Sequence, residues 1–240
     1  MTQHVSRKEL KKDEVRDTFM QGFQALASHQ QATLYIVIAA LLVVLGVFGW
    51  RTYTSRQTVK ASAAFDSSMT VFQAPIPTAG VPPQPGAVTY KDEKTKYTDA
   101  AKKFADVASK YPRTRPGELS LYYEALSLEK LDRNDEAKKD LQTLTGSSDQ
   151  DFAAMARFEL AQLDDKTGQG DAATKVYQDL IAKPTLLVPK PVVMLALAHH
   201  YGDKNPTEAA KLYTQIKADY PDTAIAEQAD QELTLLPGKS

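Results

Sequence analysis

The chain has 240 residues, no cysteine and a formal net charge of −1, with 29 basic and 30 acidic side chains. The lack of cysteine excludes disulfide bonds, thiolate nucleophiles and cysteine-ligated metal sites. A nearly neutral, mixed charge distribution also lacks the concentrated basic face that nucleic-acid binding requires. The length is ample for a domain with a hydrophobic core of its own.

The first segment, residues 1–31, is short and charged. Residues 1 to about 12 are predicted to be disordered, whereas 13–28 place four apolar side chains on one helical face: Val15, Phe19, Phe23 and Leu26. Such a face favours an amphipathic helix that lies on a membrane surface. A short, solvated lead-in helix explains the same pattern equally well.

Residues 32–50 form the most apolar stretch of the chain. From Ala32 to Trp50 there are 19 residues without a charge, close to the roughly 20 that a helix needs to cross the hydrocarbon core. Tyr35 and Trp50 stand near the two ends, where interfacial aromatic residues are common. The pattern predicts a transmembrane helix, which we expect to continue as one helix to near Phe72.

The same stretch could be a cleaved signal peptide, but two features favour an uncleaved anchor. Thirty-one residues precede it, and the apolar run is longer than the about 7–15 residues of a signal peptide. Five Lys or Arg residues precede the span and three follow it closely, which weakly favours a cytoplasmic N-terminus. In a bacterial cell the remainder, 51–240, would then face the periplasm.

A proline-rich insertion is predicted at 75–89. Between Pro75 and Gly86 there are five prolines and two glycines, which cannot form a helix. The insertion falls within the first pair of helices expected after the span. It is either a spacer or an addition on the binding face, where insertions in solenoids gather.

A repeat with a period of about 36 residues organises the rest of the chain. Ala100, Ala137, Ala173 and Ala209 are spaced by 37, 36 and 36 residues. Each alanine is followed at i+4 by a bulky side chain and at i+7 by an aliphatic one, which places all three on one stripe of a helix. The i+4 residues are Phe104, Leu141, Tyr177 and Tyr213, and the i+7 residues are Val107, Leu144, Leu180 and Ile216. The fold class predicted is all-α, an N-terminal transmembrane helix followed by a helical-repeat solenoid.

The helices after the insertion are predicted from this stripe, from prolines and from capping residues. They are 90–110, 116–131, 134–145, 149–167, 170–182, 189–201, 206–219 and 223–235. Pro112 and Pro221 mark helix ends, and Asn134 and Asn205 are predicted to cap helix starts. The first helix of the third pair, around Leu195–Ala198, is ambiguous in register by one or two residues. The linker before it carries three apolar residues that look exposed, Leu186, Leu187 and Val188.

Catalytic patterns are missing from the sequence. No glycine-rich phosphate loop is present, and adjacent histidines such as His199 and His200 point about 100° apart on a helix, unlike the i, i+4 pair of zinc proteases. Acidic pairs such as Asp164–Asp165 are typical of solvated helix faces. The protein is therefore predicted to be no enzyme, with no cofactor and no metal site.

Partner binding is the remaining prediction. In a stack of helix pairs, the first helix of each pair lines a surface that accepts peptides or partner helices. The candidate partner-binding residues are Tyr122, Leu126, Phe158, Gln162, Met194 and Tyr201. The large apolar members of this set, Tyr122, Phe158 and Met194, fit the inter-helix core equally well.

Two resemblances follow from these residues. The small residues at helix crossings, Gly168 and the aromatic Tyr177 after Ala173 resemble the tetratricopeptide pattern. A short charged N-terminus, a span that ends in Gly49-Trp50-Arg51 with Tyr53 close behind, and repeats directly after it resemble the YfgM-like family. The proline-rich insertion departs from that family's pattern.

The family resemblance implies a bacterial inner-membrane protein with a periplasmic repeat domain, ancillary to the SecYEG translocon and working beside the membrane-anchored chaperone PpiD. The expected function is then a membrane-anchored scaffold that binds translocon subunits, a periplasmic chaperone or emerging polypeptides. An adaptor for another envelope-assembly complex, such as cytochrome maturation or outer-membrane assembly, is an alternative. So is a regulatory scaffold that faces the cytosol.

Overall fold

The computed structural model describes residues 30–77, 86, 88–168, 170–202 and 204–236, and these are helical apart from short connections. The described helices are α2 (Gln30–Phe72), α3 (Glu93–Lys110), α4 (Arg115–Glu129), α5 (Asn134–Leu144), α6 (Gln150–Lys166), α7 (Gly170–Ala182), α8 (Lys190–Tyr201), α9 (Pro206–Asp219) and α10 (Ala224–Leu235). The chain divides into two units at Arg56 and Gln57. The predicted all-α fold class is confirmed.

In the first unit, the described part of α2 exposes its apolar side chains. Every large apolar residue from Leu34 to Trp50 is exposed, from 45% at Ile38 to 70% at Tyr35 and Phe48. Among the described helices, α2 is the one long and apolar enough to cross a membrane. Its length and position are compatible with a single-pass membrane anchor or a signal sequence.

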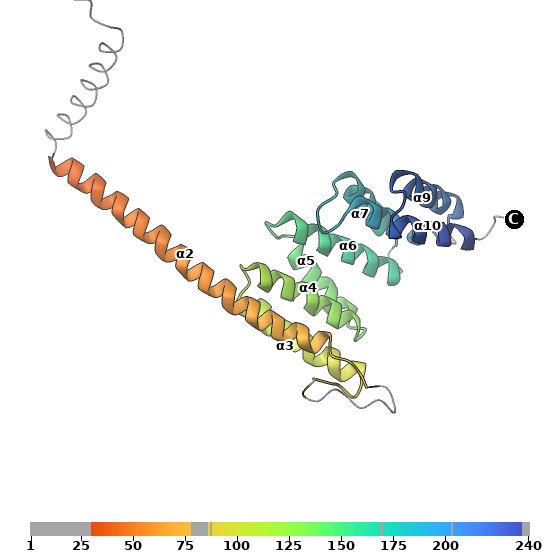
Figure 1. Ribbon diagram of the computed structural model, residues 1–240, viewed down its shortest axis with the longest axis horizontal. Helices are drawn as coiled ribbons and strands as arrows, with labels where there is room; N and C mark the ends of the chain where they lie inside the picture. The colour runs from red at the N-terminus through yellow and green to blue at the C-terminus, as the bar shows by residue number, and fades with distance from the viewer. Residues whose placement is uncertain (1–29, 78–85, 87, 169, 203, 237–240) are drawn as a thin grey trace, which may run out of the picture. The chain divides into compact units, whose positions relative to one another are not determined.

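The second unit is a series of helix pairs. Each helix from α3 to α10 packs against the next one in the chain, and α4, α6, α8 and α10 also contact one another in turn (Figure 1). The C-terminal part of α2 contributes Ala61 and Val71 to clusters with α3. The pairs are therefore α2–α3, α4–α5, α6–α7 and α8–α9, with α10 as the last helix.

The 36-residue ladder lies in the core of this unit. The four alanines are 0% exposed, and the bulky and aliphatic residues that follow them are at most 5% exposed. They lie on the second helix of each pair, α3, α5, α7 and α9, where the small alanine lets the neighbouring helix approach closely. Apolar burial of this kind is worth about 25 cal/mol per Å² and holds each pair together.

Two helix connections share the sequence Tyr-Pro-x-Thr. After α3 and after α9, a tyrosine closes the helix, a proline prevents its continuation, and Thr114 or Thr223 accepts a hydrogen bond from the third residue of the next helix at 3.1 or 3.3 Å. At the first connection this third helical residue, Gly117, must be a glycine, because a Cβ there would lie 1.9 Å from the carbonyl oxygen of Tyr111. The prolines mark the helix ends as predicted.

Most predicted helix boundaries agree with the structure within three residues, and two details differ. Asn205 caps α9 by accepting a hydrogen bond from the Glu208 amide at 3.3 Å, but Asn134 begins α5 instead of capping it, and Arg133 holds the cap position without a side-chain bond. In the linker before α8, Leu186 is 85% exposed as expected, whereas Val188 is 2% exposed because it packs against α7 and α8 residues in the core.

Some predictions fall on residues outside the described part. The amphipathic helix over 13–28 lies wholly outside it, as do residues 78–85 and 87 of the proline-rich insertion. The described flanks of the insertion include Pro75 and Pro77, which follow the end of α2 without helical structure. The helix that contains the predicted span does end at Phe72, as expected from the sequence.

Candidate functional site

The first helices of the pairs present a common surface, which we call the A-face. It is formed by the second unit's part of α2 and by α4, α6 and α8; α4, α6 and α8 contact one another in turn, and α2, α4 and α6 line one hollow. On α4, the buried residues Ser120, Ala125 and Leu128 face the neighbouring helices. This arrangement leaves Leu119, Tyr122 and Leu126 half-buried at the A-face, since helical spacing of three and four residues aligns them.

A hollow of about 530 Å³ lies in the A-face. It is mostly apolar, and its walls come from α2, α4, α6 and the linker between α7 and α8. The lining residues are Ser62, Phe65, Asp66, Arg115, Pro116, Leu119, Phe152, Met155 and Leu187. A hollow of this size and character is suited to apolar side chains of a ligand.

The linker before α8 places Leu187 over this hollow. The Leu187 amide donates a hydrogen bond to Asp151 Oδ1 at 3.3 Å, and Val188 anchors the linker in the core. Leu187 remains 46% exposed and Leu186 85% exposed. Leu187 thus adds an exposed apolar side chain to the lining of the hollow, whereas Leu186 lies outside that lining.

Beside the hollow, α4 and α6 are joined by a polar cluster. Tyr122 Oη donates a hydrogen bond to Glu159 Oε2 at 3.1 Å, and Gln162 Nε2 donates to the same oxygen at 3.4 Å. Glu129, two turns further along α4 than Tyr122, has an Oε1 atom that is buried and makes no hydrogen bond with the described residues. We call Tyr122, Glu129, Glu159 and Gln162 the A-face polar cluster.

The charges of this cluster are not balanced. Burial, followed by the charge of Glu159, raises the pKa of Glu129 to about 7, and burial raises the pKa of Glu159 against the hydrogen bond from Tyr122. Lys130 and Lys166 act in the opposite direction on Glu129 but are too weak to restore its ordinary pKa. The cluster therefore favours a proton or a cation near Glu129.

The six predicted partner-binding residues occupy different places. Gln162 is exposed, whereas Tyr122, Leu126, Phe158 and Tyr201 are half-buried and Met194 is 1% exposed. Phe158 and Tyr201 pack against core residues around Tyr177. The structure thus brings Tyr122 and Gln162 together through Glu159, whereas it places Met194 in the core between α8 and α9.

The register of α8 explains the position of Met194. Ala198, at 0% exposure, is the small residue at the helix crossing. On the other side of the helix, Val192 is 37% exposed and the His199 side chain is 44% exposed. The open face of α8 therefore lies on the side of the helix away from Met194. This is the stretch in which the sequence pattern left the register ambiguous.

A histidine network fixes α6, α7 and α8 behind the A-face. His200 Nε2 lies 2.9 Å from Thr174 Oγ1, and its Nδ1 lies 2.8 Å from Asp165 Oδ1, without hydrogen-bond alignment. The latter contact is an ion pair when the imidazole is protonated. Because the His200 side chain is 8% exposed, this network is part of the packing between pairs.

Sequence reasoning missed the two glutamates of the A-face polar cluster. Glu129 follows Tyr122 and Leu126 on the same face of α4, at the i+7 position, and Glu159 lies 37 residues after Tyr122, which is one repeat. Repeat spacing could therefore have paired Tyr122 with Glu159. Over the described residues, no group of three or more His, Cys, Asp or Glu side chains has the arrangement of a metal site.

The comparisons with protein families give two matches. Residues 25–183 match the tetratricopeptide repeat-like domain, and residues 193–223 match the tetratricopeptide repeat. Among curated proteins and among solved structures, none matches the chain. Domains of this type are protein-interaction scaffolds that are typically non-catalytic, in agreement with the stacked helix pairs and the open A-face. The chain belongs to the tetratricopeptide repeat-like domain family.

Proposed function

We propose that this protein is a membrane-anchored scaffold that binds segments of partner proteins at its A-face. The observation that carries the proposal is the apolar hollow of about 530 Å³ beside the A-face polar cluster. Apolar side chains of a partner would enter the hollow, and its polar groups would pair with Tyr122, Glu129 and Gln162. No bond is made or broken in this function.

The anchor is proposed from the first unit. Large apolar side chains from Leu34 to Trp50 are all exposed, which costs about 25 cal/mol per Å² in water and is relieved in lipid. The family match begins at residue 25 and therefore includes this apolar segment. Cleavage after the apolar segment would remove part of the matched domain. The match therefore supports an anchor that is retained in the mature protein.

The division of the chain follows from this reading. We assign residues 1–31 to a cytoplasmic segment, 32–50 to the transmembrane span, and 51–240 to the repeat domain with its insertion at 75–89. The excess of Lys and Arg before the span, five against three, supports a periplasmic repeat domain in a bacterial inner membrane. The resemblance to the YfgM-like family supports a place beside the secretion translocon and its periplasmic chaperones.

The orientation can be tested directly because the chain has no cysteine. A single cysteine introduced at Gln178, which is exposed on α7, reports the side of the membrane through a thiol reagent that does not cross it. Labelling of intact spheroplasts is expected for a periplasmic repeat domain. Labelling only after lysis would place the domain in the cytosol and contradict the proposed location.

The binding surface is tested by co-purification of the tagged full-length chain in a mild detergent, with partners identified by mass spectrometry. The variant Leu187→Asp places a charge at the rim of the hollow, whereas the matched control Leu186→Asp places it on the neighbouring residue outside the lining. We expect recovery of translocon subunits or a periplasmic chaperone to fall at least about tenfold for Leu187→Asp, about 1.4 kcal/mol. The control should behave as the wild type.

Two outcomes would contradict parts of the proposal. Equal losses in both variants would show that general surface polarity, and not the A-face hollow, governs partner recovery. Recovery of partners from a different envelope complex, with the same dependence on Leu187, would support the scaffold function. It would contradict the proposed association with the translocon.

A further inference from the structure

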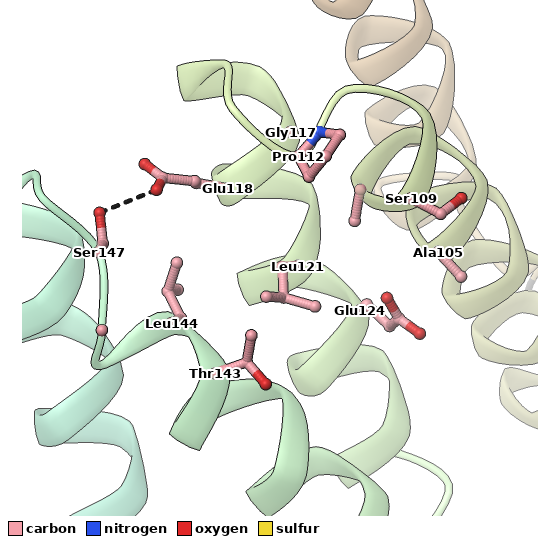
Figure 2. A pocket seen from close by; sticks show the side chains of 12 residues that line it. Ala105, Ser109, Pro112, Gly117, Glu118, Leu121, Glu124, Thr143, Leu144 and Ser147 are labelled. Atoms are coloured by element: carbon pink, nitrogen blue, oxygen red, sulfur yellow. Dashed lines mark hydrogen bonds between the residues drawn. The ribbon is translucent and has the colours of Figure 1, made fainter.

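A second hollow lies on the other side of α4, between α3 and α5. It has a volume of about 540 Å³, and α4 forms its floor (Figure 2). Leu121 and Glu124 of α4 line this hollow. Each lies two positions after an A-face residue, Leu119 or Tyr122. Residues two positions apart on a helix point about 200° apart, so the two pairs face opposite sides of α4. We call this site the B-face hollow, and it shares no lining residue with the A-face hollow.

The interior of the B-face hollow is mostly apolar. Ala105 and Ala108 of α3 belong to one wall. Leu144 at the end of α5 belongs to the other, with Leu121 of α4 between Ala105 and Leu144 (Figure 2). Ala108 and Leu144 are 9% and 2% exposed, so both walls are continuous with the core. The small alanines leave room for side chains of a ligand at this point.

The charged groups that line this hollow are two carboxylates of α4, beside the hydroxyl groups of Ser109, Thr143 and Ser147. Glu118 accepts a hydrogen bond from Ser147 Oγ at 2.9 Å, and Glu124 stands beside Leu121 on α4 (Figure 2). Burial, then the charge of Asp140 on α5, raises the pKa of Glu124 to about 7. Asp106 on α3 adds to the same effect. Acidic residues of three helices thus act on the carboxyl group of Glu124, which itself lines the hollow.

The cation that acts on Glu124 does not neutralise this charge. Arg133 acts on Glu124 in the opposite direction, but its guanidinium is engaged by Glu136 through two hydrogen bonds of 2.6 Å. Glu136 itself raises the pKa of Glu124, so the bound pair contributes little net charge. Burial likewise raises the pKa of Asp140, to about 6. Lys139 acts on Asp140 in the opposite direction, as Arg133 does on Glu124, but neither cation restores the ordinary pKa of its neighbour. Among the described residues that act on them, the acidic groups therefore outweigh the cations at this edge of the hollow.

From this combination of an apolar interior and an unbalanced acidic edge, we propose that the B-face hollow docks a protein segment that carries aliphatic side chains next to lysine or arginine. The aliphatic side chain would fill the space between Ala105, Leu121 and Leu144, and the cation would pair with Glu124 and Asp140. Acidic segments, nucleic acids and anionic lipid headgroups are repelled by the same carboxylates. The site is independent of the A-face, so the scaffold could hold two partners at once.

The test uses the full-length chain in phosphatidylcholine nanodiscs, whose neutral surface does not attract a cationic probe. The probe is a fluorescently labelled peptide of about 12 residues, about 18 Å as a helix, with leucines at i, i+3, i+4 and i+7 and lysines elsewhere. A matched peptide carries glutamates in place of the lysines. Binding is followed by fluorescence anisotropy, and signal from empty nanodiscs is subtracted.

The informative variant combines Glu124→Gln with Asp140→Asn, which keeps the side-chain shapes and removes both charges. We expect it to weaken binding of the lysine peptide at least about tenfold. The A-face variant Gln162→Ala should leave that binding unchanged, and the glutamate peptide should not bind the wild type. Circular dichroism of the variant should match the wild type, because removing buried charges does not disturb packing.

A pH series provides a second readout. As the pH rises from 6 to 8, Glu124 and Asp140 lose their protons, and the lysine peptide should bind more tightly to the wild type but not to the double variant. Equal affinity of wild type and variant, equal binding of both peptides, or loss of binding in Gln162→Ala would overturn the proposal. So would a dimer that forms through this face and excludes the peptide.

Discussion

The ladder and the A-face of the repeat unit differ in how deeply their residues are buried and in how well their polar groups are paired. On α3, α5, α7 and α9 the ladder residues are at most 5% exposed and form the core. On α4 and α6, Tyr122, Glu129 and Glu159 are half-buried, with carboxyl groups whose pKa values are raised. The ladder residues serve packing. The A-face residues include polar groups without a full set of partners, which are costly to bury in a core.

This difference separates stability from binding. A ladder substitution should unfold neighbouring pairs and abolish every activity together, because stacked repeats stabilise one another. A substitution on the A-face should change partner binding with little effect on the free energy of unfolding. The following predictions test that separation, in order of decreasing effect.

The largest effect is expected at Tyr177, which is 1% exposed and packs against Phe158 with a ring-centroid distance of 6.1 Å. Tyr177→Ala should lower the free energy of unfolding by about 3–5 kcal/mol, because it leaves a cavity that the helices cannot fill. Chemical denaturation followed by circular dichroism measures this. A loss below about 1 kcal/mol would show that the ladder does not form the core.

A smaller loss is expected at His200, which joins α6, α7 and α8. His200→Ala removes the contacts with Thr174 and Asp165 and should cost about 1–2 kcal/mol. The matched variant His199→Ala changes a more exposed ring and should cost less. Equal losses in the same denaturation experiment would contradict the role assigned to the network.

The half-buried carboxyl groups predict a pH dependence of stability. The pKa values of Glu124 and Glu129 rise from 4.5 to about 7 on folding, so the folded chain binds more protons than the unfolded chain between these values. The contribution of these two groups to the free energy of unfolding should be fully present below pH 4.5. It should be lost as the pH rises through about 7. After allowance for solvent screening the loss is about 1 kcal/mol per group.

The matched variant for this measurement is Glu124→Gln with Glu129→Gln, which cannot ionise at either position. Its thermal midpoint should vary less between pH 5 and pH 8 than that of the wild type. A wild-type midpoint that rises over the same interval would contradict the assignment of raised pKa values to these two groups.

The smallest effect on stability is expected at the rim of the A-face hollow. Leu187 is 46% exposed, so Leu187→Asp should change the free energy of unfolding by about 0.5 kcal/mol or less. The same variant is expected to reduce partner recovery strongly. A large loss of stability would show that Leu187 is structural and would remove the distinction between the two regions at this residue.

The repeat fold was predictable because its determinants are local and periodic. Ala137 or Ala209 with an apolar residue at i+4 and i+7 specifies both a helix and its buried face, and prolines such as Pro112 mark the ends. The cap of α5 was not predictable from Asn134, because the preceding loop places that residue one position inside the helix. Boundaries of this kind depend on tertiary contacts.

The candidate site was only partly predictable, for a different reason. Tyr122 and Gln162 were chosen from the register of α4 and α6, but Glu159 joins them only because neighbouring pairs stack at one particular offset. In α8 the register itself was uncertain, and Met194 lies in the core at 1% exposure. The two hollows depend on how three or four segments meet, which a single sequence does not specify.

The most direct test of the central claim is site-specific photo-crosslinking in living cells. A photoreactive amino acid replaces Gln162, which is exposed on the A-face, or Gln178, which is exposed on α7. The account predicts partner adducts from position 162 that are absent at position 178 and are lost when Leu187→Asp is added. Adducts of equal yield at both positions, or adducts at 178 alone, would contradict an A-face that binds partners.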